Sequence, residues 1–269
     1  MTGFLEAILL GVVQGITEWL PVSSKGNVSI LGQFLGMPVK EAFSYAIILH
    51  VGTLIAAAFY FRKDLFEIVS GQDKEKRGFV FWTLAATAIT AIPSYFVLKK
   101  LLETASFSFA GMTFYSQTIF LFTVGFFLAV TGFLQAAKKK EKKAELSRKN
   151  AVLLGLGQGF TVLPGMSRSG TTSSIMLFEG FSPEKAFELS FLISVPTVLF
   201  GELAFNLLEQ PALEPSMVAG IAAAAVTGFI SIGFFIEVAK KINFARFCFA
   251  LAVIYFLIGI ATVLVPQIA

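Results

Sequence analysis

Eight apolar stretches run along this chain of 269 residues, and six of them are uninterrupted. Each of the six has the roughly 20 residues that an α-helix needs to cross the hydrocarbon core of a bilayer. The chain is also 56% hydrophobic and only 14% charged, which is typical of integral membrane proteins. The sequence therefore predicts six transmembrane helices, at about residues 43–61, 80–98, 115–137, 186–207, 217–238 and 246–266.

The other two apolar stretches, residues 4–36 and 151–180, are each broken near the centre by a proline, Pro21 or Pro164, followed by polar residues. A helix break at membrane depth is tolerated only inside protein or beside a water-filled cavity, because lipid cannot satisfy the freed backbone groups. We therefore expect two re-entrant helix–loop–helix hairpins in addition to the six spans. The predicted fold class is all-α and integral to the membrane.

The two broken stretches are similar to each other. "LLGVVQGITEWLPVSSKG" at 9–26 aligns with "LLGLGQGFTVLPGMSRSG" at 153–170, with Gln14 over Gln158 and the two prolines matched after a one-residue gap. This similarity indicates an internal duplication. Close approach between helices is expected at the glycine pairs of both copies, Gly11 with Gly15 and Gly155 with Gly159.

Each hairpin is followed by three spans, so an odd number of crossings separates the two copies. The two halves must then be inverted relative to each other. We predict a single membrane domain, residues 1–269, made of two inverted repeats at about 1–140 and 150–269. A basic cytoplasmic loop at 138–149 joins the repeats.

Lysine and arginine positions give the orientation, because short cytoplasmic loops carry an excess of these residues. Loops 62–78, 138–149 and 239–246 together hold fifteen of them, whereas the alternate loops hold only Lys99 and Lys100. This bias places both termini and the mouth of the first hairpin outside the cell. The second hairpin then enters from the cytoplasm, so the two tips are expected to meet near the midplane of the plasma membrane.

The first tip carries a carboxylate. Gln14 and Glu18 are four residues apart and share one helical face. A carboxylate that points at the break is useful if it holds a cation such as Mg²⁺ against a phosphate, or if it handles a proton. The loop that follows Pro21 holds Ser23, Ser24, Lys25, Gly26 and Asn27.

The second tip carries an arginine among hydroxyl groups. A helix that begins just after a break offers free N–H groups and a positive dipole end, and both favour an anion such as phosphate. Arg168 adds a planar guanidinium that matches two phosphate oxygens. The hydroxyl residues around it are Ser167, Ser169, Thr171 and Thr172.

At these residues the chain resembles the undecaprenyl-diphosphate phosphatases associated with bacitracin resistance. The family has a Glu/Gln-x-x-x-Glu motif that runs into Pro-Val-Ser-Ser, here "QGITEWLPVSS", and a Pro-Gly-x-Ser-Arg-Ser-x-x-Thr motif, here "PGMSRSGTT". The resemblance covers nearly the whole chain. It implies hydrolysis of the terminal phosphate of undecaprenyl (polyprenyl) diphosphate at a pocket open to the outer face, which recycles the lipid carrier for cell-wall polysaccharide such as peptidoglycan.

The resemblance also implies a set of roles. It assigns catalysis to Glu18, Ser24 and Arg168, with Ser24 attacking phosphorus or orienting water. It implies a divalent cation held at Glu18, Mg²⁺ with Ca²⁺ as the alternative. The expected partners are the polyprenyl diphosphate and membrane lipids, and no nucleic acid is expected. Whether the protein forms a homodimer is left open. By motif match the substrate-binding residues are Gln14, Ser23, Ser167, Ser169 and Thr172, and we add Lys25 and Asn27 from the loop of the first tip.

One departure from the family concerns the first tip. Well-studied bacterial members read Ser-Ser-Thr-Gly-His, whereas this chain reads "SSKGN", with Lys25 at the Thr position and Asn27 at the His position. An asparagine cannot exchange a proton near neutral pH. Either Glu18 does the proton work, or Lys25 and Asn27 only hold phosphate oxygens, or the chain no longer hydrolyses its ligand.

Two alternatives stay open. Inverted repeats with broken helices are also a common transporter plan, so a carrier of polyprenyl phosphate is the second function to weigh. His50, the only histidine, lies near the start of an ordinary span. We expect it to be a buried imidazole with satisfied hydrogen bonds and not the missing base.

Overall fold

The structure is a computed structural model that describes residues 3–104, 106–109, 112–137, 144–209, 214–238 and 241–264. Six of its helices are long and apolar enough to cross a membrane, which confirms the six predicted spans. All six include the predicted cores, and α5 extends beyond its predicted range at both ends. The spans are α3 (Val39–Tyr60), α5 (Lys74–Glu103), α6 (Ser116–Ala136), α9 (Pro183–Glu209), α10 (Pro215–Val238) and α11 (Phe244–Leu264).

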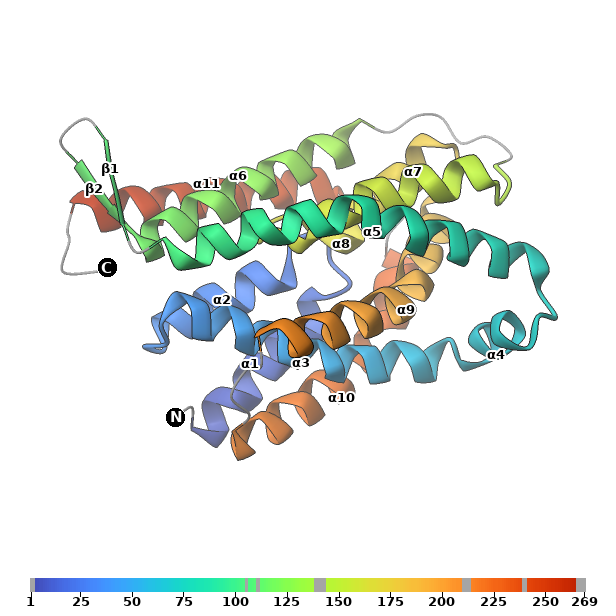
Figure 1. The fold of residues 1–269 in the computed structure, drawn as a ribbon, viewed down its shortest axis with the longest axis horizontal. Coiled ribbons are helices and arrows are strands. Elements are labelled where there is room, and N and C mark those ends of the chain that lie inside the picture. The colour runs from blue at the N-terminus through green and yellow to red at the C-terminus, as the bar shows by residue number, and fades with distance from the viewer. Residues whose placement is uncertain are drawn as a thin grey trace.

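The two broken stretches form two pairs of short helices (Figure 1). The first pair is α1 (Phe4–Thr17) and α2 (Ser24–Phe34). The second pair is α7 (Arg148–Gly159), which continues into the 3-10 turn η1 (Phe160–Val162), and α8 (Arg168–Phe178). The helix breaks therefore occur where the prolines predict them. That these pairs re-enter the membrane, and that the halves are inverted, stay predictions.

Two further elements lie outside the predicted spans. Helix α4 (Arg62–Ser70) follows α3, and a two-stranded antiparallel hairpin of β1 (Ser106–Phe109) and β2 (Met112–Tyr115) lies between α5 and α6. The hairpin was not predicted and is a small exception to the all-α class. Residues 138–143 of the basic loop lie outside the described residues.

Each broken pair packs on a span from the other half of the chain: α1 lies along α10, and α7 lies along α5. The predicted glycines make this approach close. A Cβ on Gly11 would lie 2.1 Å from the Gly220 carbonyl oxygen, and a Cβ on Gly155 would lie 2.3 Å from that of Thr83. No side chain fits at such distances, so the glycines are required by packing.

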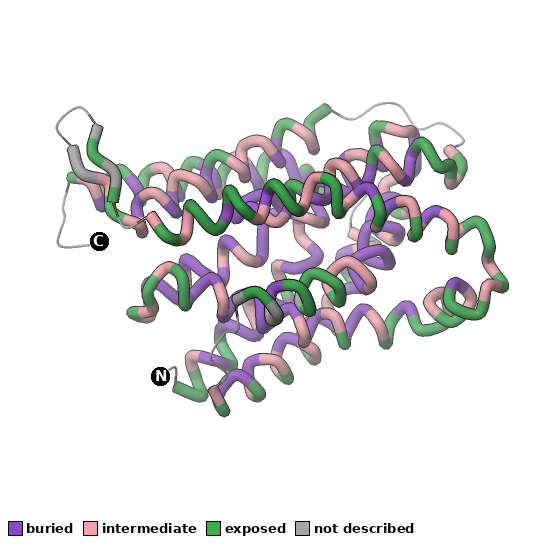
Figure 2. Tube along the Cα trace, viewed as in Figure 1, coloured by how far each residue is buried: buried purple, intermediate pink, exposed green. Residues whose placement is uncertain are grey.

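One difference in packing between the first and second parts of the chain bears on the site. Helix α3 packs along α10, whereas the corresponding helices of the other half, α9 and α5, make little contact. A cavity lies between α5 and α9 and reaches down to the two helix breaks. Figure 2 shows buried residues gathered at the centre of the molecule, where the breaks meet. The cavity thus connects the space between α5 and α9 with a buried polar centre at the helix breaks.

Candidate active site

The two helix breaks are joined by direct hydrogen bonds. The Gly165 amide donates to Ser23 Oγ at 3.0 Å, and the hydroxyls of Ser167 and Ser169 donate to the Leu20 carbonyl at 3.3 and 2.7 Å. The expected meeting of the two tips is therefore present in the fold. Side chains that are about 145 residues apart in sequence can act on one ligand.

Ser23 holds a strained position at this junction. Its φ of 61° makes it the only non-glycine residue with positive φ in the described part of the chain. Its hydroxyl oxygen caps α2 by accepting from the Gly26 amide at 3.3 Å. Backbone strain of this kind costs about 1–3 kcal/mol and persists where the surrounding structure enforces it, often at functional sites. The strained turn begins α2 with Ser24, beside the carboxylate of Glu18.

Glu18 is the centre of the polar cluster. Its Oε1 accepts from Arg168 Nη2 at 2.8 Å, which pairs a carboxylate of the first tip with a guanidinium of the second. Its Oε2 accepts from Ser24 Oγ at 2.5 Å and from Gln14 Nε2 at 2.9 Å. The side chains of Glu18 and Arg168 are only 5% and 9% exposed. A buried ion pair requires such complete pairing because each charge is costly to remove from water.

His50 joins this cluster from α3. Its Nδ1 lies 2.8 Å from the Ala46 carbonyl oxygen, so that nitrogen carries a proton. Its Nε2 lies 3.2 Å from Glu18 Oε2 and 3.5 Å from Ser24 Oγ. Two acceptors at 3.2 Å would repel each other, so one proton lies in this contact, on the imidazole or on the carboxylate. In either case the Glu18–His50 pair keeps one basic site. Ser24 donates to the same carboxylate, so the pair can take the proton of the serine hydroxyl.

Arg168 is fixed by two elements. Nη1 donates to the Ser190 carbonyl on α9 at 3.0 Å, while Nη2 donates to Glu18. The buried Nε makes no hydrogen bond with any described residue. Thr172 steadies the same turn, because its hydroxyl donates to the Arg168 carbonyl at 2.7 Å. The guanidinium is thus held in one orientation with donor capacity left.

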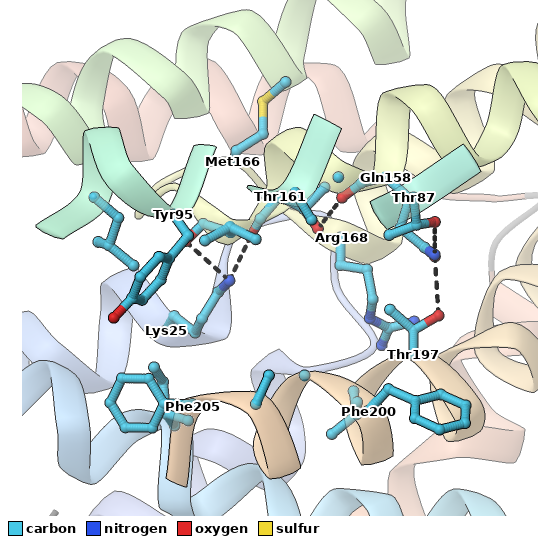
Figure 3. Close-up of a pocket in the computed structure, with 18 of the residues that line it drawn as sticks. Lys25, Thr87, Tyr95, Gln158, Thr161, Met166, Arg168, Thr197, Phe200 and Phe205 are labelled. Atoms are coloured by element: carbon cyan, nitrogen blue, oxygen red, sulfur yellow. Dashed lines mark hydrogen bonds between the residues drawn. The ribbon is translucent and has the colours of Figure 1, made fainter. Parts of the chain in front are cut away.

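Lys25 reaches in the opposite direction, from the first tip to the second. Its ammonium donates to the Thr161 carbonyl and, at 3.4 Å, to the Val162 carbonyl, at the end of η1. Figure 3 shows Lys25 and Arg168 entering one cavity from different elements. Each tip therefore has a positively charged side chain that contacts the other tip: Lys25 from the first and Arg168 from the second.

The cavity has a volume of about 720 Å³. Most of its wall is apolar and comes from α5, including Phe96, and from α9, including Phe200 and Phe205. Figure 3 shows Phe200 and Phe205 beside the cavity. A second polar group lies in the wall, where Gln158 donates to Thr87 and Thr197 at 3.0 and 2.9 Å. The predicted site residues that line the cavity are Glu18, Ser23, Ser24, Lys25, Ser167 and Arg168.

Four predicted substrate-binding residues do not line this cavity. Gln14 donates a hydrogen bond to the Glu18 carboxylate, and Ser169 and Thr172 stabilise the second tip through hydrogen bonds to backbone carbonyls. Asn27 donates to the carbonyls of Val22 and Ser23 at 2.7 and 2.9 Å and accepts from the Tyr255 hydroxyl. Contact of these four with substrate stays a prediction, and their observed bonds position other residues of the site.

His50 is the site residue that sequence reasoning missed. It is buried, as expected, but it lines the cavity and contacts Glu18, which was not expected. The sequence feature that could have identified His50 is its residue type, because an ionisable side chain inside an apolar span commonly marks a functional site. Its position on α3 could not show which neighbour it faces.

The donor set around Glu18 does not fit a resident divalent ion. The carboxylate oxygens already accept from an amide, a hydroxyl and a guanidinium, and the last of these would repel a metal cation. Across the described residues, no three His, Cys, Asp or Glu side chains gather into a group that could hold a metal ion. The divalent cation stays a prediction that these side chains do not support.

Together, the fold and the site define a class: a helical, multi-pass membrane protein in which two helix breaks join a carboxylate, a serine and an arginine at the base of an apolar cavity. The sequence profile of the family described as "Bacitracin resistance protein BacA" matches residues 7–257. The chain belongs to this family.

Its relatives match it over nearly the whole chain. A protein named "Undecaprenyl-diphosphatase" from Methanococcoides burtonii is 35% identical over 94% of this chain and 97% of its own. Another of the same name, from Methanothrix thermoacetophila, is 36% identical over 93% of this chain and 94% of its own. "Undecaprenyl-diphosphatase 1" from Shouchella clausii is 32% identical over 94% and 95%. The predicted resemblance is confirmed.

Proposed function

We propose that this chain hydrolyses undecaprenyl (polyprenyl) diphosphate to the monophosphate and inorganic phosphate, and so recycles a lipid carrier of cell-wall polysaccharide synthesis. The observation that carries this proposal is the Glu18–Arg168 pair, with Ser24 Oγ 2.5 Å from the carboxylate, at the base of an apolar cavity. The names of the relatives support the same activity.

Substrate orientation follows from the chemistry of the cavity. The diphosphate fits the polar base, where Arg168, Lys25 and the N-termini of α2 and α8 all favour negative charge. The polyprenyl chain fits the apolar walls of α5 and α9, because burying it there removes hydrocarbon from water. The reacting phosphorus then lies beside Ser24.

In the proposed reaction, Ser24 Oγ attacks the terminal phosphorus and the bridging P–O bond breaks, which releases the polyprenyl monophosphate. The serine proton passes to the Glu18–His50 pair. Arg168 binds the oxygens on which negative charge increases in the transition state. Water then cleaves the phosphoserine, releases inorganic phosphate and restores the hydroxyl.

The orientation in the membrane is part of the proposal. The charge bias of the loops supports both termini and the catalytic face on the outside of the plasma membrane. The exchange of partners between halves, α1 on α10 and α7 on α5, supports two inverted repeats. The homodimer stays a prediction. No contact in the site favours the carrier alternative over hydrolysis.

Phosphate release decides between hydrolysis and simple binding. Purified protein in nanodiscs is expected to release one phosphate per undecaprenyl diphosphate and to leave the monophosphate. Ser24→Ala is expected to lose at least about 100-fold in turnover because it removes the nucleophile. An inert wild type that moves polyprenyl phosphate between leaflets would support the carrier instead.

His50→Gln tests the proton pathway. The amide can replace hydrogen bonds but cannot exchange a proton at neutral pH, so we expect kcat to fall about 100-fold while KM stays within about threefold. Initial rates across substrate concentrations measure both constants. Thr118→Val is the matched control, because it removes a buried hydrogen bond to Thr262 that lies away from the cavity. Near-normal kcat in His50→Gln would make His50 a structural residue.

A further inference from the structure

The proposed reaction does not say which group neutralises the terminal phosphate near the scissile bond. The terminal phosphoryl group of a diphosphate is transferred readily when its negative charge is offset, usually by a divalent cation or by protein cations. Around Glu18 the donors do not fit a resident metal, as described above. The charge of Arg168 is itself paired with Glu18 at 2.8 Å.

Lys25 is placed to supply this charge. It lies on the first turn of α2, next to Ser24, and it lines the same cavity as Ser24 and Arg168. Its ammonium spans the junction of the two tips, because it donates to carbonyls of η1 in the second tip. A bound terminal phosphate beside Ser24 would therefore lie within reach of a side chain from the neighbouring residue.

The contacts of Lys25 also allow an exchange of partners. Thr161 and Val162 offer neutral backbone carbonyls at the C-terminal end of a helical turn, where the negative end of the dipole holds a cation. A phosphate oxygen is a stronger acceptor for an ammonium because both groups are charged. The flexible lysine stem lets the ammonium turn toward that oxygen while the tips stay joined by Ser23 and Gly165.

We infer that Lys25 occupies the role of a divalent cation at the terminal phosphate, so that this chain binds the diphosphate of its substrate without a bound metal ion. The inference rests on the proposed function for its substrate. It goes further by naming the group that neutralises the phosphate.

Turnover with and without metal is the first test. Wild-type protein in nanodiscs, stripped with EDTA, is expected to release phosphate within about twofold of its rate in Mg²⁺. Lys25→Thr is expected to be about 10- to 100-fold slower in EDTA, the loss of one charge-assisted contact, and to recover in part with Mg²⁺. Lys25→Arg should keep most of the metal-free rate. Lys63→Thr, on the exposed surface of α4, is the control.

Binding provides a test that does not depend on turnover. A non-hydrolysable polyprenyl methylenediphosphonate is titrated into wild-type protein and Lys25→Thr, once in EDTA and once with Mn²⁺ and no EDTA, and Mn²⁺ in the second complex is measured by electron paramagnetic resonance. We expect wild type to bind the diphosphonate without stoichiometric Mn²⁺, and Lys25→Thr to bind it about tenfold or more weakly.

The outcomes separate the two proposals. An inert wild type that still binds the diphosphonate through Lys25 without metal would overturn hydrolysis and keep the inference. A wild type that loses more than about tenfold in EDTA, regains it with Mg²⁺ and holds one Mn²⁺ per complex would overturn the inference and keep hydrolysis. Protein that is folded but binds no diphosphonate would overturn both.

Discussion

Arg168→Lys is expected to lower turnover of polyprenyl diphosphate by about 100- to 1000-fold, although the charge is kept. The guanidinium uses separate nitrogens for Glu18 and for the Ser190 carbonyl, at 2.8 and 3.0 Å. An ammonium is a point charge that cannot hold these directions at once. Losing one preorganised donor to a transition-state oxyanion typically costs a factor of this size.

The measurement is kcat/KM for phosphate release in nanodiscs, with thermal unfolding as the check on folding. Arg62→Lys serves as the control, because Arg62 lies on the exposed start of α4 and donates to the Phe59 carbonyl, away from the cavity. Near-normal turnover of folded Arg168→Lys would mean that Arg168 serves topology or packing and not the reaction.

Glu18→Gln is expected to abolish hydrolysis, with a loss of at least about 1000-fold. The amide cannot accept the Ser24 proton, which ends the proton pathway. It also leaves the buried guanidinium of Arg168 without its carboxylate partner, and breaking a buried pair typically costs about 3–5 kcal/mol. Both effects act on the same centre, so the variant should lose stability as well as turnover.

Stability and turnover must therefore be measured together. We expect Glu18→Gln to be inert in EDTA and in Mg²⁺ alike, and to unfold at a lower temperature than wild type. Glu75→Gln, on the exposed start of α5, should change neither quantity. If Glu18→Gln hydrolysed normally in EDTA but lost its response to Mg²⁺, Glu18 would be a metal ligand and not a proton acceptor.

The two broken stretches carry matching glutamines, Gln14 and Gln158, but contribute different chemistry to the site. Gln14 donates to Glu18 and to Thr53 on α3, and Gln158 donates to Thr197 on α9 in the other half. Only the first half adds a carboxylate next to its glutamine. The second half contributes Arg168 instead, so neither half can assemble the catalytic set alone.

Sequence alone determined the features that depend on local composition. Apolar runs of sufficient length predicted all six spans, because a helix must match the thickness of the hydrocarbon core. Pro21 and Pro164 predicted the two breaks, since proline removes a helical hydrogen bond and polar residues follow it. The motifs around Glu18 and Arg168 predicted that two distant segments share one ligand, and these side chains do form an ion pair.

Tertiary structure alone decided which polar side chains reach the cavity. A helix buried among apolar neighbours has no polar face that reveals its rotation, so the sequence could not show that His50 faces Glu18. Nor could the sequence show that the Asn27 amide accepts from the Tyr255 hydroxyl of α11, a contact set by helix packing. The cavity itself exists because α5 and α9 separate where α10 and α3 pack closely. Distances between helices far apart in sequence are set by side-chain packing along their whole length, which no local pattern encodes.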